Sequence, residues 1–322
     1  MAKRLGQVAA RSLETEGANI LKTAAANKVP GSLAMALDGT LKRGHDMRVF
    51  GLGTAASMAS RARYGRFTRS MHAVYATMEE ELDATLAAAA GEGGGVSSSP
   101  VGLVWERHGA VLRREAALLE DLTDVGLVPF ARPGLLDASG SGSGSGSVGA
   151  DDSDKGGGDW VGAVSPATAA YVAAIREAGA SDRRMVVGDG GAGGEGLDGG
   201  GRLLGQFYVR YFADLFGGQM LGLPTQVAVG LAPGTPRHYD FDIKDRRAFI
   251  GQVYASLNDA GALLANTDRA APAQQEAVVE EAMKAWRGNV RVYSEETGMW
   301  VDAARGAANV AVGLARRQVF GQ

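Results

Sequence analysis

The stretch that decides the fold is Tyr208 to Gln219, which reads YVRYFADLFGGQ. Its mostly apolar composition predicts a helix, yet two adjacent glycines, Gly217 and Gly218, stand within it. Each glycine inside a helix costs about 1 kcal/mol relative to alanine. A glycine pair either ends the helix, with Gly217 as its cap, or kinks it and lets a flat ligand approach a backbone without Cβ atoms. The glycines alone leave both interpretations open.

The sequence on either side of this stretch also has helical periodicity. Apolar residues recur at three- and four-residue spacing in three further segments: Leu33, Leu37 and Leu41; Phe67, Met71, Val74, Tyr75 and Met78; and Leu112, Ala116, Leu119 and Leu122. Four more helices are expected over residues 166–178, 203–221, 246–264 and 272–296, two of them with proline in the first turn. No convincing alternating strand pattern is found. The sequence therefore predicts the all-α class.

The domain boundaries follow from composition. One helical domain is expected over residues 32–298, with an N-terminal extension over 1–31 and a C-terminal tail over 299–322. Glycine- and serine-rich stretches at 137–158 and 188–201 cannot bury enough apolar surface to order themselves, so they are interpreted as flexible insertions. The early basic residues of the extension are compatible with a targeting segment.

Bulk properties exclude several classes of protein. The 322 residues are 45% hydrophobic with a net charge of −3, and the basic residues are scattered, so nucleic acid is not expected as a partner. Cysteine is absent, which removes disulfides, thiolate ligands and cysteine nucleophiles and argues against secretion. No apolar run reaches the roughly 18 residues of a membrane span. A soluble protein without a transmembrane anchor is expected.

The 208–219 stretch resembles the distal-helix signature of heme oxygenases, Tyr-x-Arg-Tyr-x-Gly-Asp-x-Ser-Gly-Gly-Gln. Here Ala213 and Phe216 replace the signature's glycine and serine. Four other blocks are similar to the family in the same order: Tyr75 to Leu82, Arg114 to Leu122, Ser165 to Gly179 and Glu280 to Tyr293. With the spacing of Leu33, Leu37, Lys42 and His45, the resemblance spans roughly residues 33–296. The resemblance implies a single helical domain that holds heme between a proximal and a distal helix.

The chain has four histidines, His45, His72, His108 and His238, and a lone histidine is more often structural than a ligand. The resemblance points to His45 as the axial ligand of the heme iron, since it lies eight residues after Leu37 as in the family's first helix. A neutral imidazole suits heme iron and leaves the other axial position open for O2.

The resemblance also implies the reaction and its residues. Heme serves as substrate and cofactor, and O2 with external electrons converts it to biliverdin, iron and carbon monoxide. Asp214 is expected to act through an ordered water, anchored by Arg210 and Tyr75, while Ala213, Gly217 and Gly218 lie over the heme face. The alternative for Asp214 and Arg210 is an ordinary i, i+4 ion pair on a helix.

Heme also carries two propionates, which Lys42 and Tyr208 are expected to contact as in the family. The family's later Lys and Arg pair is missing here, and Lys244, Arg246 and Arg247 are candidates to substitute for it. Because a methyl at Ala213 and a ring at Phe216 crowd the heme face, a second function stays open. It is a heme-binding carrier or sensor that keeps the fold without turnover.

Electrons must come from another protein, because no flavin or nicotinamide fingerprint is present. The resemblance implies a ferredoxin or a flavoprotein reductase as the donor. The expected compartment is the cytoplasm or the plastid stroma.

Overall fold

The computed structural model describes residues 25–44, 47–91, 99–128, 164–186, 200–265 and 271–320. Throughout these ranges the regular elements are helices and no strand occurs, which confirms the predicted all-α class. The α-helices are α2 (Leu33–Gly44), α3 (Met47–Ser57), α4 (Arg61–Gly91), α5 (Pro100–Leu112), α6 (Glu115–Asp124), α7 (Pro166–Val186), α8 (Arg202–Phe216), α9 (Gly222–Val229), α10 (Arg246–Ala265), α11 (Ala271–Ser294) and α12 (Met299–Phe320). Short 3-10 helices are η1 (Ala25–Lys28), η3 (Gly218–Met220) and η4 (Arg237–Tyr239).

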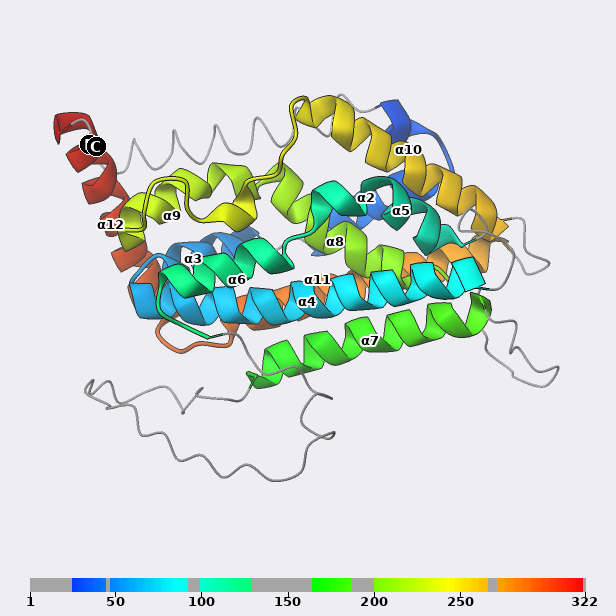
Figure 1. Ribbon diagram of the computed structural model, residues 1–322, viewed down its shortest axis with the longest axis horizontal. Coiled ribbons are helices and arrows are strands. Elements are labelled where there is room, and N and C mark those ends of the chain that lie inside the picture. Colours follow the sequence, from blue (N-terminus) through cyan, green and yellow to red (C-terminus); the bar gives the residue numbers. More distant parts are fainter. Residues whose placement is uncertain are drawn as a thin grey trace, which may run out of the picture.

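Helix α8 occupies the centre of this arrangement. It packs against α11, α7, α5, α4, α10 and α2, while the long helices α4 and α7 lie side by side along one edge of the molecule (Figure 1). Nearly all of its residues are buried, from Leu203 to Phe212 and from Asp214 to Phe216. A helix buried on all sides has no solvated face, so its few polar groups must find partners inside the protein.

The start of α8 is fixed by a carboxylate from α7. Asp182 accepts the backbone N–H of Arg202 at 3.0 Å and that of Leu203 at 2.8 Å, which satisfies two donors that a helix start leaves unpaired. The preceding residue, Gly201, has φ +80°, a conformation that favours glycine. Together these residues set where the central helix begins.

The acidic residues of α4 tie two neighbouring helices, α6 and α7, to α4. Glu79 accepts the backbone N–H groups of Arg114 and Glu115, the first residues of the α6 turn, at 2.6 and 3.0 Å. Glu81 pairs with Arg183 of α7, and Gly179 leaves room for it, because a Cβ there would meet the Glu81 side chain. These acidic residues thus hold helices together rather than form a solvated face.

Three predicted segments lie partly or wholly outside the described residues. Residues 1–24 and the insertion at 137–158 lie outside the described residues, as do 187–199. Residues 299–320, set apart in the sequence as a tail, form helix α12, which packs against α3 and α9 at one end of the molecule (Figure 1).

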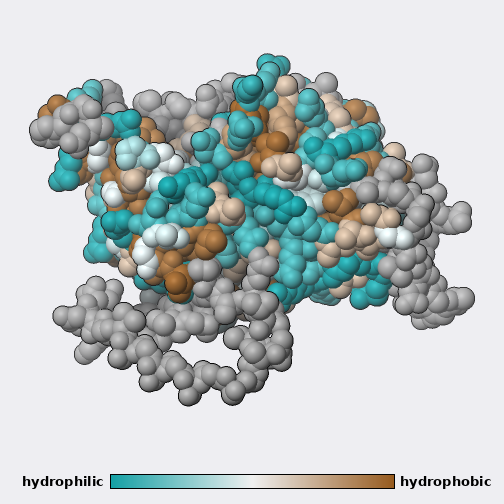
Figure 2. Space-filling model, viewed as in Figure 1, coloured by the Kyte–Doolittle hydropathy of each residue, from teal (hydrophilic) through white to brown (hydrophobic). Residues whose placement is uncertain are grey.

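Hydrophilic side chains cover most of the described surface on the face drawn in Figure 2, and apolar side chains form separate patches there. Across the described ranges, none of the helices is both long and apolar enough to cross a membrane.

The close packing of α8 against α11 at Gly205 yields a prediction about stability. A Cβ on Gly205 would lie 2.5 Å from the Val278 carbonyl oxygen and 2.7 Å from the Ala282 nitrogen, both backbone atoms. We expect Gly205→Ala to lower the free energy of unfolding by about 1–3 kcal/mol, because the backbones must separate. Urea denaturation measures this. Gly251→Ala is the control, because its Cβ meets nothing within 4 Å, and we expect it to stabilise by up to about 1 kcal/mol. Equal effects of the two variants would contradict the close packing.

The capping carboxylate yields a prediction about pH. Burial outweighs its hydrogen bonds and raises the pKa of Asp182 to about 7. The native state therefore binds a proton that the unfolded chain, with a carboxyl pKa of about 3.9, has released. This group makes stability fall as pH rises from about 4 to 7. We expect urea midpoints of Asp182→Asn to decline less between pH 5 and 7.5 than those of the unchanged protein. Parallel pH profiles of the two proteins would refute it.

Candidate active site

Arg210 and Asp214 of α8 form a buried ion pair that Tyr75 of α4 completes. The Arg210 Nη2 atom lies 2.7 Å from Asp214 Oδ1, and the Tyr75 hydroxyl donates to Asp214 Oδ2. Arg210 Nε also donates to the Tyr75 hydroxyl oxygen, at 3.2 Å. The three residues are 3%, 5% and 0% exposed, respectively. The alternative of an ordinary i, i+4 surface pair therefore does not describe this contact, because both charges are removed from water.

A third helix supports the arginine. Arg210 Nη1 donates to Asn289 Oδ1 of α11 at 2.9 Å. The Asn289 Nδ2 group and the nearby Tyr171 hydroxyl of α7 are buried without a hydrogen-bond partner in the protein. Buried polar groups of this kind usually bind ordered water. The site therefore offers places for water behind α8.

The electrostatics of the site keep the guanidinium charged and the phenol protonated. Burial is the largest single effect on Arg210 and would lower its pKa, but the Asp214 charge and the surrounding tyrosines together outweigh it and hold this pKa well above its ordinary value. Burial, together with the same charge, raises the pKa of Tyr75 well above its ordinary value. Tyr75 therefore remains a hydrogen-bond donor to the carboxylate. A carboxylate fixed on both sides keeps further lone pairs with which to accept from a water or a ligand.

The glycine pair marks the end of α8. The helix stops at Phe216, Gly217 is its cap, and the Gly217 N–H donates to the Ala213 carbonyl at 2.9 Å. A Cβ on Gly218 would lie 2.9 Å from the Tyr239 ring and 3.2 Å from Asp214 Cβ. A Cβ on Gly217 would meet within 4 Å only the carbonyl of Ala213. Of the two interpretations, the helix end is the one observed, and it places the acid in the last turn.

The two departures from the signature lie beside that turn. Ala213 is partly exposed, whereas Phe216 is 9% exposed and packs edge-on against Phe212, with ring centroids 5.4 Å apart. The Phe216 ring thus joins the aromatic core of α8.

Tyr208, expected at a propionate, is engaged elsewhere. Its hydroxyl donates to Asp38 Oδ1 of α2 at 2.6 Å, and the Tyr254 hydroxyl of α10 donates to the same oxygen, also at 2.6 Å. It does not join the group formed by Tyr75, Arg210 and Asp214.

The expected iron ligand, His45, lies outside the described residues, and the side chain of Lys42 is not described either. Helix α2 ends at Gly44, the residue before His45. Leu33 and Leu37 of this helix are fully buried, and a Cβ on Gly44 would lie 2.4 Å from the Trp286 ring of α11. The end of α2 is therefore packed closely against α11.

Two of the other histidines have structural partners. His108 lies 2.9 Å from the Ser256 hydroxyl, and burial lowers its pKa to about 4. His238 lies 2.6 Å from Asp121, which also accepts its backbone N–H. In the described ranges there is no group of three or more histidine or acidic side chains that could hold a metal ion by themselves.

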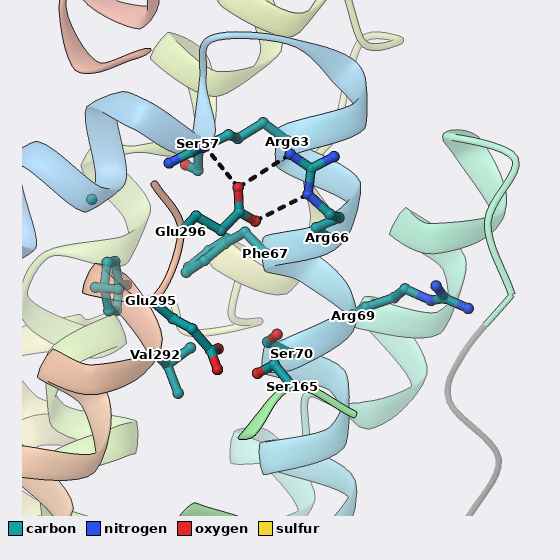
Figure 3. Close-up of a pocket in the computed structure, with 12 residues that line it drawn as sticks. Ser57, Arg63, Arg66, Phe67, Arg69, Ser70, Ser165, Val292, Glu295 and Glu296 are labelled. Carbon is teal, nitrogen blue, oxygen red and sulfur yellow. Dashed lines mark hydrogen bonds and ion pairs between the residues drawn. The ribbon is translucent and has the colours of Figure 1, made fainter. Parts of the chain in front are cut away.

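A solvent-open cleft of about 580 Å³ lies between α3, α4, the start of α7 and the end of α11. Figure 3 shows the carboxylate of Glu296 between Arg63 and Arg66, at 2.8 and 3.0 Å. Arg69 points away from them and donates to the Val128 carbonyl. Tyr293 also borders the cleft, and burial raises its pKa although the nearby Arg210 charge lowers it. The charges of Glu296, Arg63 and Arg66 in the cleft are matched to one another.

Asp38, Tyr171 and Tyr293 contribute to the surroundings of the site and were missed from the sequence. Asn289 and Tyr293 are spaced i, i+4 on α11, and this shared face was the available signal. No local pattern pairs Asp38 with tyrosines 170 and 216 residues away.

Comparison with known proteins gives a consistent result. A family model described as heme oxygenase matches residues 198–295, which include α8, its glycine pair and α11 up to Asn289 and Tyr293. The heme oxygenase 1 of Synechocystis sp. is 32% identical over 102 residues, 31% of this chain and 39% of the relative. That of Nostoc sp. is 30% identical over 142 residues, 44% of this chain and 49% of the relative. The chain thus spans less than half the length of the curated relatives it matches.

The buried pair yields a prediction about stability. We expect Asp214→Ala to lower the free energy of unfolding by about 3–5 kcal/mol, because it leaves the Arg210 charge buried and unpaired. The control is Asp259→Ala, whose partner Arg107 is 47% exposed, and it should cost about 1 kcal/mol or less. Denaturant titrations at pH 7 compare the two. Similar losses would show that Arg210 and Asp214 contribute no more than a surface pair.

Proposed function

We propose that this chain, which a heme oxygenase family model matches over residues 198–295, opens the porphyrin ring of heme with O2 and external electrons, giving biliverdin, iron and carbon monoxide. The observation that carries the proposal is the buried Asp214 carboxylate, held by Arg210 and Tyr75 in the last turn before two glycines. Both oxygens of this carboxylate are held in place, yet they can accept further hydrogen bonds. Such a carboxylate is suited to positioning a proton beside a flat ligand.

The residues of the site fit a heme on this side. The Cβ space of Gly217 is open except for a carbonyl of its own turn, and the partly exposed Ala213 lies one turn earlier. We propose that these backbone atoms face one side of the porphyrin. His45, directly after α2 in the sequence, is the residue that would bind the heme iron, and Lys42 would supply the cation for a propionate.

Bound heme would supply the iron that activates O2 and the ring that is cleaved. The chain's own residues position water and protons. Asp214 would accept a hydrogen bond from an ordered water and orient it toward the ligand. Arg210 holds one oxygen of the carboxylate, and Tyr75 fixes the other. The unpartnered Asn289 and Tyr171 groups supply polar contacts for further waters behind the helix.

Electrons would come from a partner protein, a ferredoxin or a flavoprotein reductase. Both classes deliver single electrons, and a reconstitution with each donor in turn distinguishes them.

A specific observation favours a second candidate, a heme carrier or sensor. Ala213 adds a methyl group, and Phe216 places an aromatic ring in the last turn, where the family signature has glycine and serine. If these groups displace the ordered water, heme binds without turnover.

The proposed function is tested by adding hemin to the purified protein and recording its absorption spectrum. We expect a histidine-ligated Soret band that His45→Ala abolishes or strongly shifts. With O2 and an electron donor, the band should disappear while biliverdin forms. Asp214→Asn should keep hemin binding and lose roughly a hundredfold or more in turnover, the lower end for a group that manages a proton.

The outcomes separate the candidates. A stable Soret band under turnover conditions would support the carrier, and Ala213→Gly with Phe216→Ser should then restore ring opening. If the protein does not bind hemin, or if His45→Ala leaves the spectrum unchanged, both candidate functions are overturned.

A further inference from the structure

Helix α12 packs against α3 and α9 through its small and polar residues. A Cβ on Gly306 would overlap the Ala55 carbonyl oxygen of α3, and a Cβ on Gly313 would lie 2.6 Å from the Val227 carbonyl oxygen of α9. The Asn309 side-chain amide donates to two backbone carbonyls directly after α3, at 3.1 and 3.0 Å. Because only glycine allows such close approach, these contacts fix which side of α12 faces the protein and which faces solvent.

The solvent-facing side of α12 is apolar. A helix on a protein surface normally has its apolar stripe inside and its polar residues outside. On α12 the exposed residues include a continuous apolar side, which we call the outer face: Trp300, Val301, Ala304, Ala307, Ala308, Ala311, Val312, Leu314, Ala315 and Val319. Trp300 and Val319, near the two ends of the helix, are 70% and 73% exposed. Such a surface marks a site of contact with something less polar than water.

Charges of one sign border the outer face, and they are all arginines: Arg305, Arg316 and Arg317. Residues 303–322 include no acidic residue. Asp302 is the single acid of α12, and its carboxylate lies 2.6 Å from Arg63 of α4 and 3.8 Å from Arg305. Helix α9 lies at the same end of the molecule (Figure 1), and residues 217–236, which contain it, carry no charge. This end of the molecule therefore combines apolar side chains with positive charge.

This combination fits a lipid surface better than a protein. A second copy of the chain would bring more arginines and no acid to the outer face, and like charges repel. A specific protein partner would also need hydrogen-bonding groups within the contact, and Gln318 is the single uncharged polar residue exposed on the described part of α12. An anionic bilayer needs no such groups. Apolar side chains enter its acyl boundary, arginines reach its head groups, and tryptophan is enriched at that depth.

We propose that α12 docks the protein on an anionic membrane surface. The helix would lie in the plane of the interface, with its outer face in the lipid and its three arginines at the phosphates. This inference goes beyond the proposed function and does not depend on heme, because it concerns a surface made by α12 alone.

Co-sedimentation of the full chain with vesicles tests the proposal. We expect binding to vesicles of equal parts phosphatidylcholine and phosphatidylglycerol, and at least about tenfold weaker binding to phosphatidylcholine alone, because each arginine near an anionic surface contributes roughly fivefold. Arg316→Gln with Arg317→Gln should weaken binding to the anionic vesicles by roughly tenfold or more. No binding to the anionic vesicles, or equal binding to both kinds, would overturn the proposal.

A matched pair of double variants tests the outer face itself. Val301→Glu with Val312→Glu should weaken vesicle binding by at least about tenfold, because carboxylates would have to enter the lipid. The control, Leu119→Glu with Val128→Glu, makes the same change at exposed apolar positions outside α12 and should retain most of the binding. All four side chains are exposed, so both variants should keep the urea midpoint of the unchanged protein. Equal losses of binding in the two variants would contradict the assignment of α12.

Sedimentation velocity without lipid distinguishes the other occupant, a second copy of the chain. We expect a monomer whose sedimentation coefficient is the same in the Val301 and Val312 double variant. A dimer that this variant dissociates, in a protein that does not bind the vesicles, would assign the outer face to a second copy and overturn the proposal.

Discussion

The structure depends on one buried charge pair, Arg210 with Asp214, shared by hydrogen bonds with Tyr75 and Asn289. Ions that leave water lose several kcal/mol of hydration each, and only well-placed partners offset that loss. The partners come from α4 and α11, so these helices must keep their position relative to α8. A pair of this kind adds little net stability and is strongly destabilising when broken. It therefore fixes geometry more than it stabilises the fold.

Small residues and caps around α8 make that geometry attainable. Gly205 lets the α11 backbone approach, and Asp182 fixes the first turn from α7. At the other end Gly217 stops the helix one turn after the acid. The helix that carries the polar groups is thus fixed at both ends. A site that holds a water or a proton in one place requires a rigid support of this kind.

The sequence was sufficient to predict the main helices and to predict that Arg210 and Asp214 of α8 act together. Apolar periodicity located α4, α7, α8, α10 and α11, and the resemblance joined Arg210 and Asp214 to Tyr75, which the structure brings into contact. It was not sufficient for Asp38, because its tyrosine partners lie on helices distant in sequence. The sequence also left open whether Gly217 ends or kinks the helix, since glycine is compatible with both. The close packing of Gly218 against Tyr239 and Asp214 decides between them. The assignments of His45 and Lys42 stay predictions.

A crystal structure of the hemin complex would show whether heme binds beside the last turn of α8. We predict that the iron is bound by the imidazole of His45 and that the Asp214 carboxylate, still paired with Arg210 and Tyr75, faces the opposite side of the porphyrin through an ordered water. Iron bound by another histidine, or a porphyrin bound away from Gly217 and the last turn of α8, would contradict it.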